Sequence, residues 1–189
     1  MLGAVLYHMI AADTLLWNRS LRRVAGCVVA MVAALGACVA RASDTVPTFS
    51  ATALTGQAVT SADLVGQPAV LILTPSRKAA SDTRQWAKAL RDTLAHGVFV
   101  RDILAVDLPF FMSEADAIGR ARDKIPARYY DQTWLMSTQT LESALGVPAG
   151  SNRAFVFVLD AQGRTRARVS GAPTARRMEE IQTALRSVR

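Results

Sequence analysis

The chain contains almost no cysteine and almost no histidine. Its two cysteines, Cys27 and Cys38, both lie near the N-terminus of the 189 residues. The chain after Cys38 therefore cannot form a structural disulfide or use a thiol of its own in an active site. The two histidines, His8 and His96, stand apart from each other, and no pair of acids has the spacing of metal ligands. The sequence thus predicts no metal site.

The common catalytic motifs are absent as well. The chain has no glycine-rich phosphate loop and no dinucleotide-binding fingerprint. A Ser-His-Asp hydrolase would need His96, and Ser81 lies roughly 22 Å from it by helical rise on the same expected helix. Ser76 is the other serine of this region, and it precedes that helix. The sequence therefore predicts no catalytic residue and no cofactor.

Basic side chains are in excess, but they are dispersed. The net charge is +7 and the pI is about 10.2. From Ser43 onward, 18 Lys and Arg residues are balanced by 14 Asp and Glu residues, which leaves about +4 for this part. No basic run there is longer than two residues, and aromatic residues do not alternate with the basic ones. This pattern favours a solvated, moderately basic surface over a nucleic-acid-binding groove.

The first 42 residues have the layout of an export signal. Arg19, Arg22 and Arg23 precede the uninterrupted apolar run Val24–Ala40, which ends in small residues. We expect a signal or anchor segment over residues 1–42, a linker over 43–48 and a folded domain over 49–189. The less favoured alternative is that the N-terminal apolar run forms a buried core helix. We expect the folded domain on the periplasmic side of the bacterial inner membrane, because arginines before an uncleaved apolar run would keep the N-terminus in the cytoplasm.

Three fates of this N-terminal segment stay open. Leu35–Cys38 is similar to a bacterial lipobox, in which Cys38 would be lipidated and become the mature N-terminus. Ala40-Arg41-Ala42 fits the A-x-A cleavage pattern and would leave Ser43 first. Without cleavage, the apolar run is just long enough for a membrane anchor. Each fate puts the folded domain outside the cytoplasmic membrane.

The folded part is organised around the stretch Ala69–Ala95. An apolar strand, Ala69–Leu73, leads through a polar turn into a helix with Trp86, Leu90 and Leu94 at four-residue spacing, which places them on one face. Many α/β proteins place their chemistry where a strand runs into a helix N-terminus, because free amide donors point outward there. The turn of this chain is therefore the first place to look for a site.

The rest of the pattern predicts a mixed α/β sheet with helices on both faces. A helix between the first two core strands makes a parallel βαβ unit, and the chain ends in an antiparallel ββα unit. Besides the strand and helix of 69–95, the expected elements are a hairpin of Phe49–Ala53 with Gln57–Thr60, a one-turn helix Ala62–Val65 capped by Ser61, a strand Val98–Val106, a helix within Phe110–Ile125, a short edge strand Tyr129–Met136, a helix Leu141–Leu145 capped by Thr138 or Thr140, a hairpin of Ala154–Leu159 with Arg164–Val169, and a last helix docked through Met178, Ile181, Leu185 and Val188.

This element order is that of thioredoxin, and Pro47–Arg189 resembles the redoxin branch of the thioredoxin-like proteins. The residues that carry the resemblance are Pro47-Thr48-Phe49, Gly56–Thr60 followed by Asp63-Leu64, Gly66-Gln67-Pro68, and Phe155–Asp160 with Gly163. The chain also resembles a narrower family built on this fold, the mitochondrial ATP synthase assembly factors. That likeness lies in Ile125-Pro126 with Tyr129-Tyr130, Leu141–Gly146, Phe155–Asp160, Arg164-Thr165-Arg166 before Ser170-Gly171, and Glu179-Glu180.

The chain departs from the redox members of this superfamily at their reactive positions. Those members carry one or two cysteines at the start of the first long helix, where the amide donors lower the thiol pKa. The corresponding turn here, about Ser76–Ser81, holds serines and cations. The redox members also have a proline just before the third core strand. In this chain that position is near Arg153-Ala154, and only a register shift would bring Pro148 to it. The resemblance therefore implies a binding role and not electron transfer.

The candidate docking residues are Ser76, Arg77, Lys78, Ser81 and Arg153. Ser76, Arg77 and Lys78 stand at a helix N-terminus, where the helix dipole and the cations together favour an anion or a carboxylate terminus. The alternative is that Ser76 is simply the N-cap and the two cations are solvated. By the same resemblance, Arg153 stands where peroxidase-type relatives have an arginine that supports the thiolate. Because this chain has no thiolate there, the favoured alternative is a surface arginine at the end of a strand.

The combined expectation is an exported, membrane-associated thioredoxin-like binding or assembly module without thiol redox activity. Its partner would be a protein, in a membrane complex, and it would not bind nucleic acid. The alternative function is a redoxin-like oxidoreductase that uses a partner's thiol or non-thiol chemistry.

Overall fold

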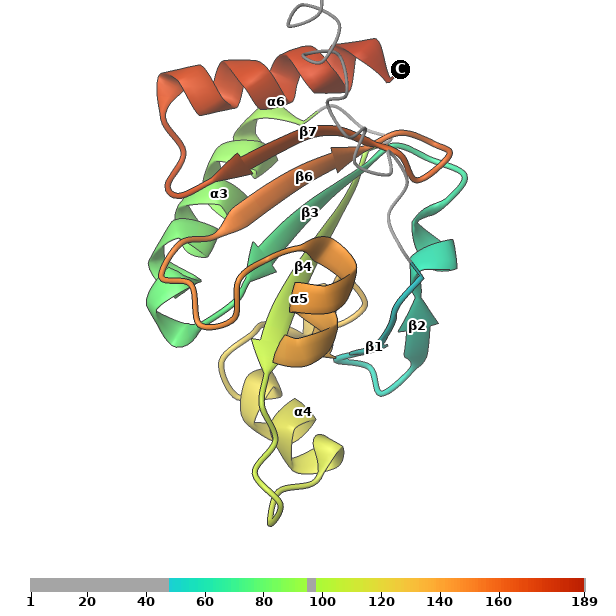
Figure 1. Ribbon diagram of the computed structural model, residues 1–189, viewed down its shortest axis with the longest axis vertical. Helices are drawn as coiled ribbons and strands as arrows, with labels where there is room; N and C mark the ends of the chain where they lie inside the picture. The colour runs from blue at the N-terminus through green and yellow to red at the C-terminus, as the bar shows by residue number, and fades with distance from the viewer. Residues whose placement is uncertain (1–47, 95–97, 189) are drawn as a thin grey trace, which may run out of the picture. The chain divides into compact units, whose positions relative to one another are not determined.

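The computed structural model describes residues 48–94 and 98–188. A seven-stranded mixed sheet runs through this part of the chain in the order β2-β1-β5-β4-β3-β6-β7 (Figure 1). The three central strands β3, β4 and β5 are parallel, β6 and β7 continue the sheet antiparallel on one side, and the β1–β2 hairpin continues it on the other. The strands are β1 Ser50–Ala53, β2 Ala58–Thr60, β3 Ala69–Thr74, β4 Phe99–Val106, β5 Thr133–Ser137, β6 Phe155–Leu159 and β7 Thr165–Ser170.

The helices connect these strands in the expected order. The α-helices are α3 Ala80–Thr93, α4 Glu114–Arg122, α5 Thr138–Leu145 and α6 Ala175–Ser187, and the 3₁₀ turns are η1 Ser61–Leu64, η2 Arg77–Ala79 and η3 Ala127–Tyr129. The expected caps need two corrections. The N-cap of η1 is Thr60, and Ser61 is the first residue of the turn. The N-cap of α5 is Ser137, whose hydroxyl accepts a hydrogen bond from the Thr140 amide. Thr138 and Thr140 already lie inside α5, and an N-cap needs an extended backbone.

The sheet has an apolar layer on each face, because every residue of β3, one of its three central strands, is buried and successive side chains point to opposite sides. On one face, Val70 and Ile72 of β3 pack with Trp86 and Leu90 of α3 and with Ile181 of α6. The core positions expected for α3 and α6 are therefore confirmed. On the same face, α4 contributes a smaller cluster around Ile118 and Leu135.

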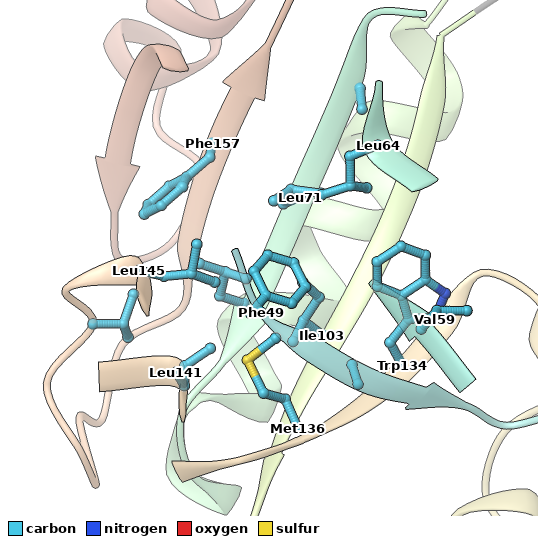
Figure 2. Close-up of a cluster of buried hydrophobic side chains, with 14 of the residues drawn as sticks. Phe49, Val59, Leu64, Leu71, Ile103, Trp134, Met136, Leu141, Leu145 and Phe157 are labelled. Carbon is cyan, nitrogen blue, oxygen red and sulfur yellow. The ribbon is translucent and has the colours of Figure 1, made fainter. Parts of the chain in front are cut away.

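The opposite face of the sheet is covered by α5 and η1. Figure 2 shows Leu71 of β3, Ile103 of β4 and Trp134 of β5 together with Phe49 and with Leu141 of α5. The helices thus lie on both faces of the sheet, and the expected combination of a parallel βαβ unit with an antiparallel ββα unit is confirmed.

The expectation that residues 129–136 form an edge strand is wrong. The strand is β5, and it lies inside the sheet, between β4 and β1. Thr52 of β1 pairs antiparallel with Leu135, so the N-terminal hairpin covers what would otherwise be the exposed edge of β5. The segment before β5 forms η3 and not a strand.

Candidate functional site

The turn after β3 is tied to the helix that follows it. Thr74, the last residue of β3, is buried, and its hydroxyl shares a 2.7 Å hydrogen bond with the Thr83 hydroxyl of α3. The Thr83 hydroxyl also approaches the Ala79 carbonyl at 3.3 Å, and the Ala79 amide donates to the Ser76 carbonyl. The strand end, the turn and the first turn of α3 therefore form one hydrogen-bonded unit.

A second loop meets this turn, the one that leads into β6. The Ser76 hydroxyl donates to the Ser151 carbonyl at 2.7 Å, and the Ala154 amide donates to the Asp82 carboxylate at 3.4 Å. Ser76 is positionally the N-cap, but its side chain bonds the neighbouring loop and no amide of the helix. The structure thus brings the start of α3 together with the loop before β6, and internal hydrogen bonds occupy the contact.

The structure places the cationic candidates on the surface. Arg77, Lys78, Ser81 and Arg153 are exposed, and Ser76 is half-buried. No ion pair joins Arg77, Lys78 or Arg153 to another of the residues 48–94 and 98–188. Arg153 belongs to the loop that Ser76 and Asp82 bond, so the five candidates gather where these two segments meet. Their role as a docking site stays a prediction, and Cys38 lies outside the described residues.

Asp82 is a residue of this site that the sequence analysis missed. It stands in the first turn of α3, where a carboxylate is favoured by the helix dipole, and that position is a signal readable from sequence. Its bond to the amide of Ala154 is not readable, because 72 residues separate the two. Pro148 does not take the position before β6 either, since Ala154 precedes the strand and no peptide bond in the described ranges is cis.

A hollow of about 460 Å³ lies at the same edge of the sheet, where β4 and β5 end. The carboxyl ends of parallel strands are where open α/β sheets bind ligands, and roughly 300–1,000 Å³ is the usual size of a small-molecule pocket. The residues that line the hollow are Val106, Asp107, Leu108, Glu114, Ala117, Leu135, Met136, Ser137 and Gln139. No local pattern in the sequence marks any of them as a site residue.

The face of the sheet toward α3 also contains a carboxyl group. Burial raises the pKa of Asp102 on β4 to about 6, although the positive charge of Arg91 opposes this shift. Among the residues that the structure describes, no group hydrogen-bonds the buried Oδ1 of Asp102. Arg91 itself donates to the Tyr129 hydroxyl and the Ala87 carbonyl. Asp102 is therefore a half-buried acid on a central strand, and its Oδ1 atom is fully enclosed.

The described ranges lack two further features. No group of three or more His, Cys, Asp or Glu side chains within 48–94 and 98–188 has the arrangement of a metal site. Across these same residues, none of the helices has the length and apolar character needed to cross a bilayer.

The fold is similar to that of several solved proteins. A thiol:disulfide interchange protein of the thioredoxin family from Chlorobium tepidum superposes with a TM-score of 0.52 at 14% identity, over 76% of this chain and 97% of that one. An exposed lipoprotein thioredoxin from Streptococcus pneumoniae gives 0.50 at 12%, over 74% and 98%. BsSco, a member of the Sco family of cytochrome c oxidase assembly proteins, gives 0.53 at 9%, over 77% and 94%.

Comparisons by sequence give no further relative. No protein-family model matches the chain, and no curated protein matches it. The strand order, the helices on both faces and the three superpositions show that this chain has the thioredoxin-like fold.

Proposed function

We propose that this protein is an exported thioredoxin-like binding module that has no thiol redox activity of its own. One observation carries the proposal: the turn from β3 into α3, about Ser76–Ser81, holds serines and cations and no cysteine, where the redox members of the superfamily hold their thiols. Asp82 accepts a hydrogen bond from the Ala154 amide, so this contact holds the start of α3 to the loop before β6.

The proposed location is the periplasmic side of the bacterial inner membrane, with the segment over residues 1–42 as signal, lipid attachment site or anchor. The basic and apolar pattern of that segment supports this location. The proposed partner is a protein of a membrane complex, whose assembly the module would assist. Support for this finer proposal comes from the resemblance to the ATP synthase assembly factors and from the fold shared with a Sco assembly protein.

A redox assay tests the absence of thiol chemistry. We expect full-length protein to reduce insulin and to consume peroxide no faster than the blank, because the folded domain has no thiolate to attack a disulfide or a peroxide. A Cys27→Ser/Cys38→Ser variant is the control and should behave identically. Turnover that survives in this variant would instead support the alternative, an oxidoreductase of non-thiol chemistry. Turnover that disappears in it would assign the activity to the N-terminal cysteines and would also refute the proposal.

The exposed cations at the start of α3 are the proposed docking site, and a comparison of captured partners tests them. We expect Arg77→Ala/Lys78→Ala to lose a partner that the wild-type protein retains in detergent extracts, because the two charges face solvent and are free to pair with a carboxylate. The matched control is Arg84→Ala/Lys88→Ala, which removes two exposed cations of α3, the helix that follows η2. Identical partners in wild type and both variants would remove the turn as a docking site.

A further inference from the structure

The segment between β4 and α4 exposes large apolar side chains. Phe110 is fully exposed, Phe111 is 72% exposed and Leu108 is 43% exposed. The two phenylalanine rings contact each other edge to face, with their centroids 5.4 Å apart. Figure 1 shows this segment projecting below the sheet, beyond α4. Aromatic side chains that contact each other at a projecting tip, and not the core, mark an interaction surface.

The exposed tip is continuous with the hollow at the ends of β4 and β5. Leu108 belongs to both, since it lines the hollow and is partly exposed at the tip. The inner wall of the hollow is apolar, with Ala117 of α4 and Leu135 and Met136 of β5. An apolar side chain of a ligand that enters the hollow therefore contacts apolar atoms inside and the phenylalanine pair outside.

The electrostatic character of this surface differs from that of the whole protein. The chain has a net charge of +7, but residues 102–119 contain no lysine or arginine. Asp107 and Glu114 line the hollow, and neither is ion-paired to any residue of the described ranges. Asp116, which follows them, is held by the amide and the hydroxyl of Ser113 in a capping box. Asp107 and Glu114 are thus the carboxylates left to pair with a ligand.

We propose that the β4–α4 tip and the adjoining hollow bind an apolar peptide segment that carries a basic residue. The apolar side chains of the segment pack on Leu108, Phe110 and Phe111 and fill the hollow, and its guanidinium or ammonium group pairs with Asp107 and Glu114. An anionic lipid surface fits less well, because these two acids would repel it. The inference rests on the proposed binding role but is independent of the redox assay, so either can fail alone.

A titration with defined peptides tests this proposal. The full-length protein is placed in nanodiscs of neutral lipid, with empty nanodiscs as the blank. The probe is a fluorescein-labelled peptide of leucine, phenylalanine and alanine with two arginines, and its counterparts carry two glutamines or two glutamates. We expect the arginine peptide to bind most tightly, the glutamate peptide not to bind, and added salt to weaken the arginine peptide most.

Three variants locate the binding surface. Phe110→Ser/Phe111→Ser should weaken binding of the arginine peptide by about tenfold or more, because it removes the aromatic contacts. Both rings face solvent, so the variant should fold, and its melting curve verifies this. Asp107→Asn/Glu114→Gln should abolish the preference for arginine over glutamine. Val65→Ser is the matched control, since Val65 is a 57% exposed apolar residue outside this surface, and it should bind like wild type.

Two outcomes would overturn the proposal. One is equal binding of the arginine and glutamate peptides, or unchanged binding in the phenylalanine variant. The other is a membrane contact, in which no peptide binds and the tip lies in the lipid. A nitroxide attached through Phe111→Cys in the Cys27→Ser/Cys38→Ser background tests this. It would be accessible to oxygen and shielded from a water-soluble nickel chelate. That pattern would place the tip in the lipid.

Discussion

Replacing Trp86 by alanine should lower the free energy of unfolding by about 4 kcal/mol. Trp86 lies on α3, is fully buried, and packs against Val70 and Ile72 of the central strand. Its indole N–H donates to the carbonyl of Gly171 at 2.6 Å, just after β7. The substitution therefore leaves a cavity between α3 and the sheet, and it also leaves a buried carbonyl without its donor. Urea unfolding followed by circular dichroism measures the loss.

Trp86→Phe separates the two contributions. It keeps most of the apolar volume and removes the donor to Gly171, so the expected loss is smaller, about 1–3 kcal/mol. Similar losses for the phenylalanine and alanine variants would show that the hydrogen bond dominates. A loss below about 1 kcal/mol for alanine would contradict the packing of α3 on the sheet.

Replacing Asp102 by asparagine should stabilise the protein at pH 7 by up to about 2 kcal/mol. The pKa of Asp102 is about 6 in the folded state because the carboxyl is buried, and it is near 3.9 in an unfolded chain. The folded state therefore binds the proton more tightly, and stability that is present below about pH 4 is lost as the pH rises through 6. The full difference corresponds to about 3 kcal/mol. The amide of asparagine retains part of this cost because it is also polar and buried.

The pH dependence of stability is the decisive measurement for Asp102. Wild type should lose stability between about pH 4 and pH 6.5 relative to Asp102→Asn, and the two curves should converge at the acid end. Asp107→Asn is the control, since Asp107 is an exposed carboxylate just after the same strand. If the Asp102→Asn variant is less stable than wild type at pH 7, the fold stabilises the carboxylate, and this would contradict the raised pKa of Asp102.

Local patterns predicted the core of this fold well. Trp86 and Leu90 were expected inside because they recur at four-residue spacing, and both are buried. The position of β5 was wrong because its second neighbour, β1, comes from a distant part of the chain that no local pattern identifies. The cap of α5 was misplaced for a different reason: Ser137, Thr138 and Thr140 are all hydroxyl residues, and each of them is acceptable as an N-cap.

The candidate site was predictable only in part. The strand-to-helix pattern predicts the turn that contains Ser76. The hydrogen bond from the Ser76 hydroxyl to the Ser151 carbonyl is not predictable in this way, because it depends on how the loop before β6 folds back. Phe110 and Phe111 pose the opposite problem. Apolar residues are most often buried, so the sequence offered no reason to expect two exposed rings before α4. Surfaces of this kind become visible only when the space around them is known.

The pairing of β1 with β5 has a consequence for how the chain acquires its fold. Thr52 pairs with Leu135, 83 positions later, so the first strands to be synthesised must wait for their partner. A two-stranded hairpin is marginally stable by itself, and closing so long a loop slows folding. At roughly 5–20 residues per second, the wait lasts about 4–17 s. During that interval one edge of the hairpin is unpaired and open to a chaperone or to aggregation, which makes its docking a late step of maturation.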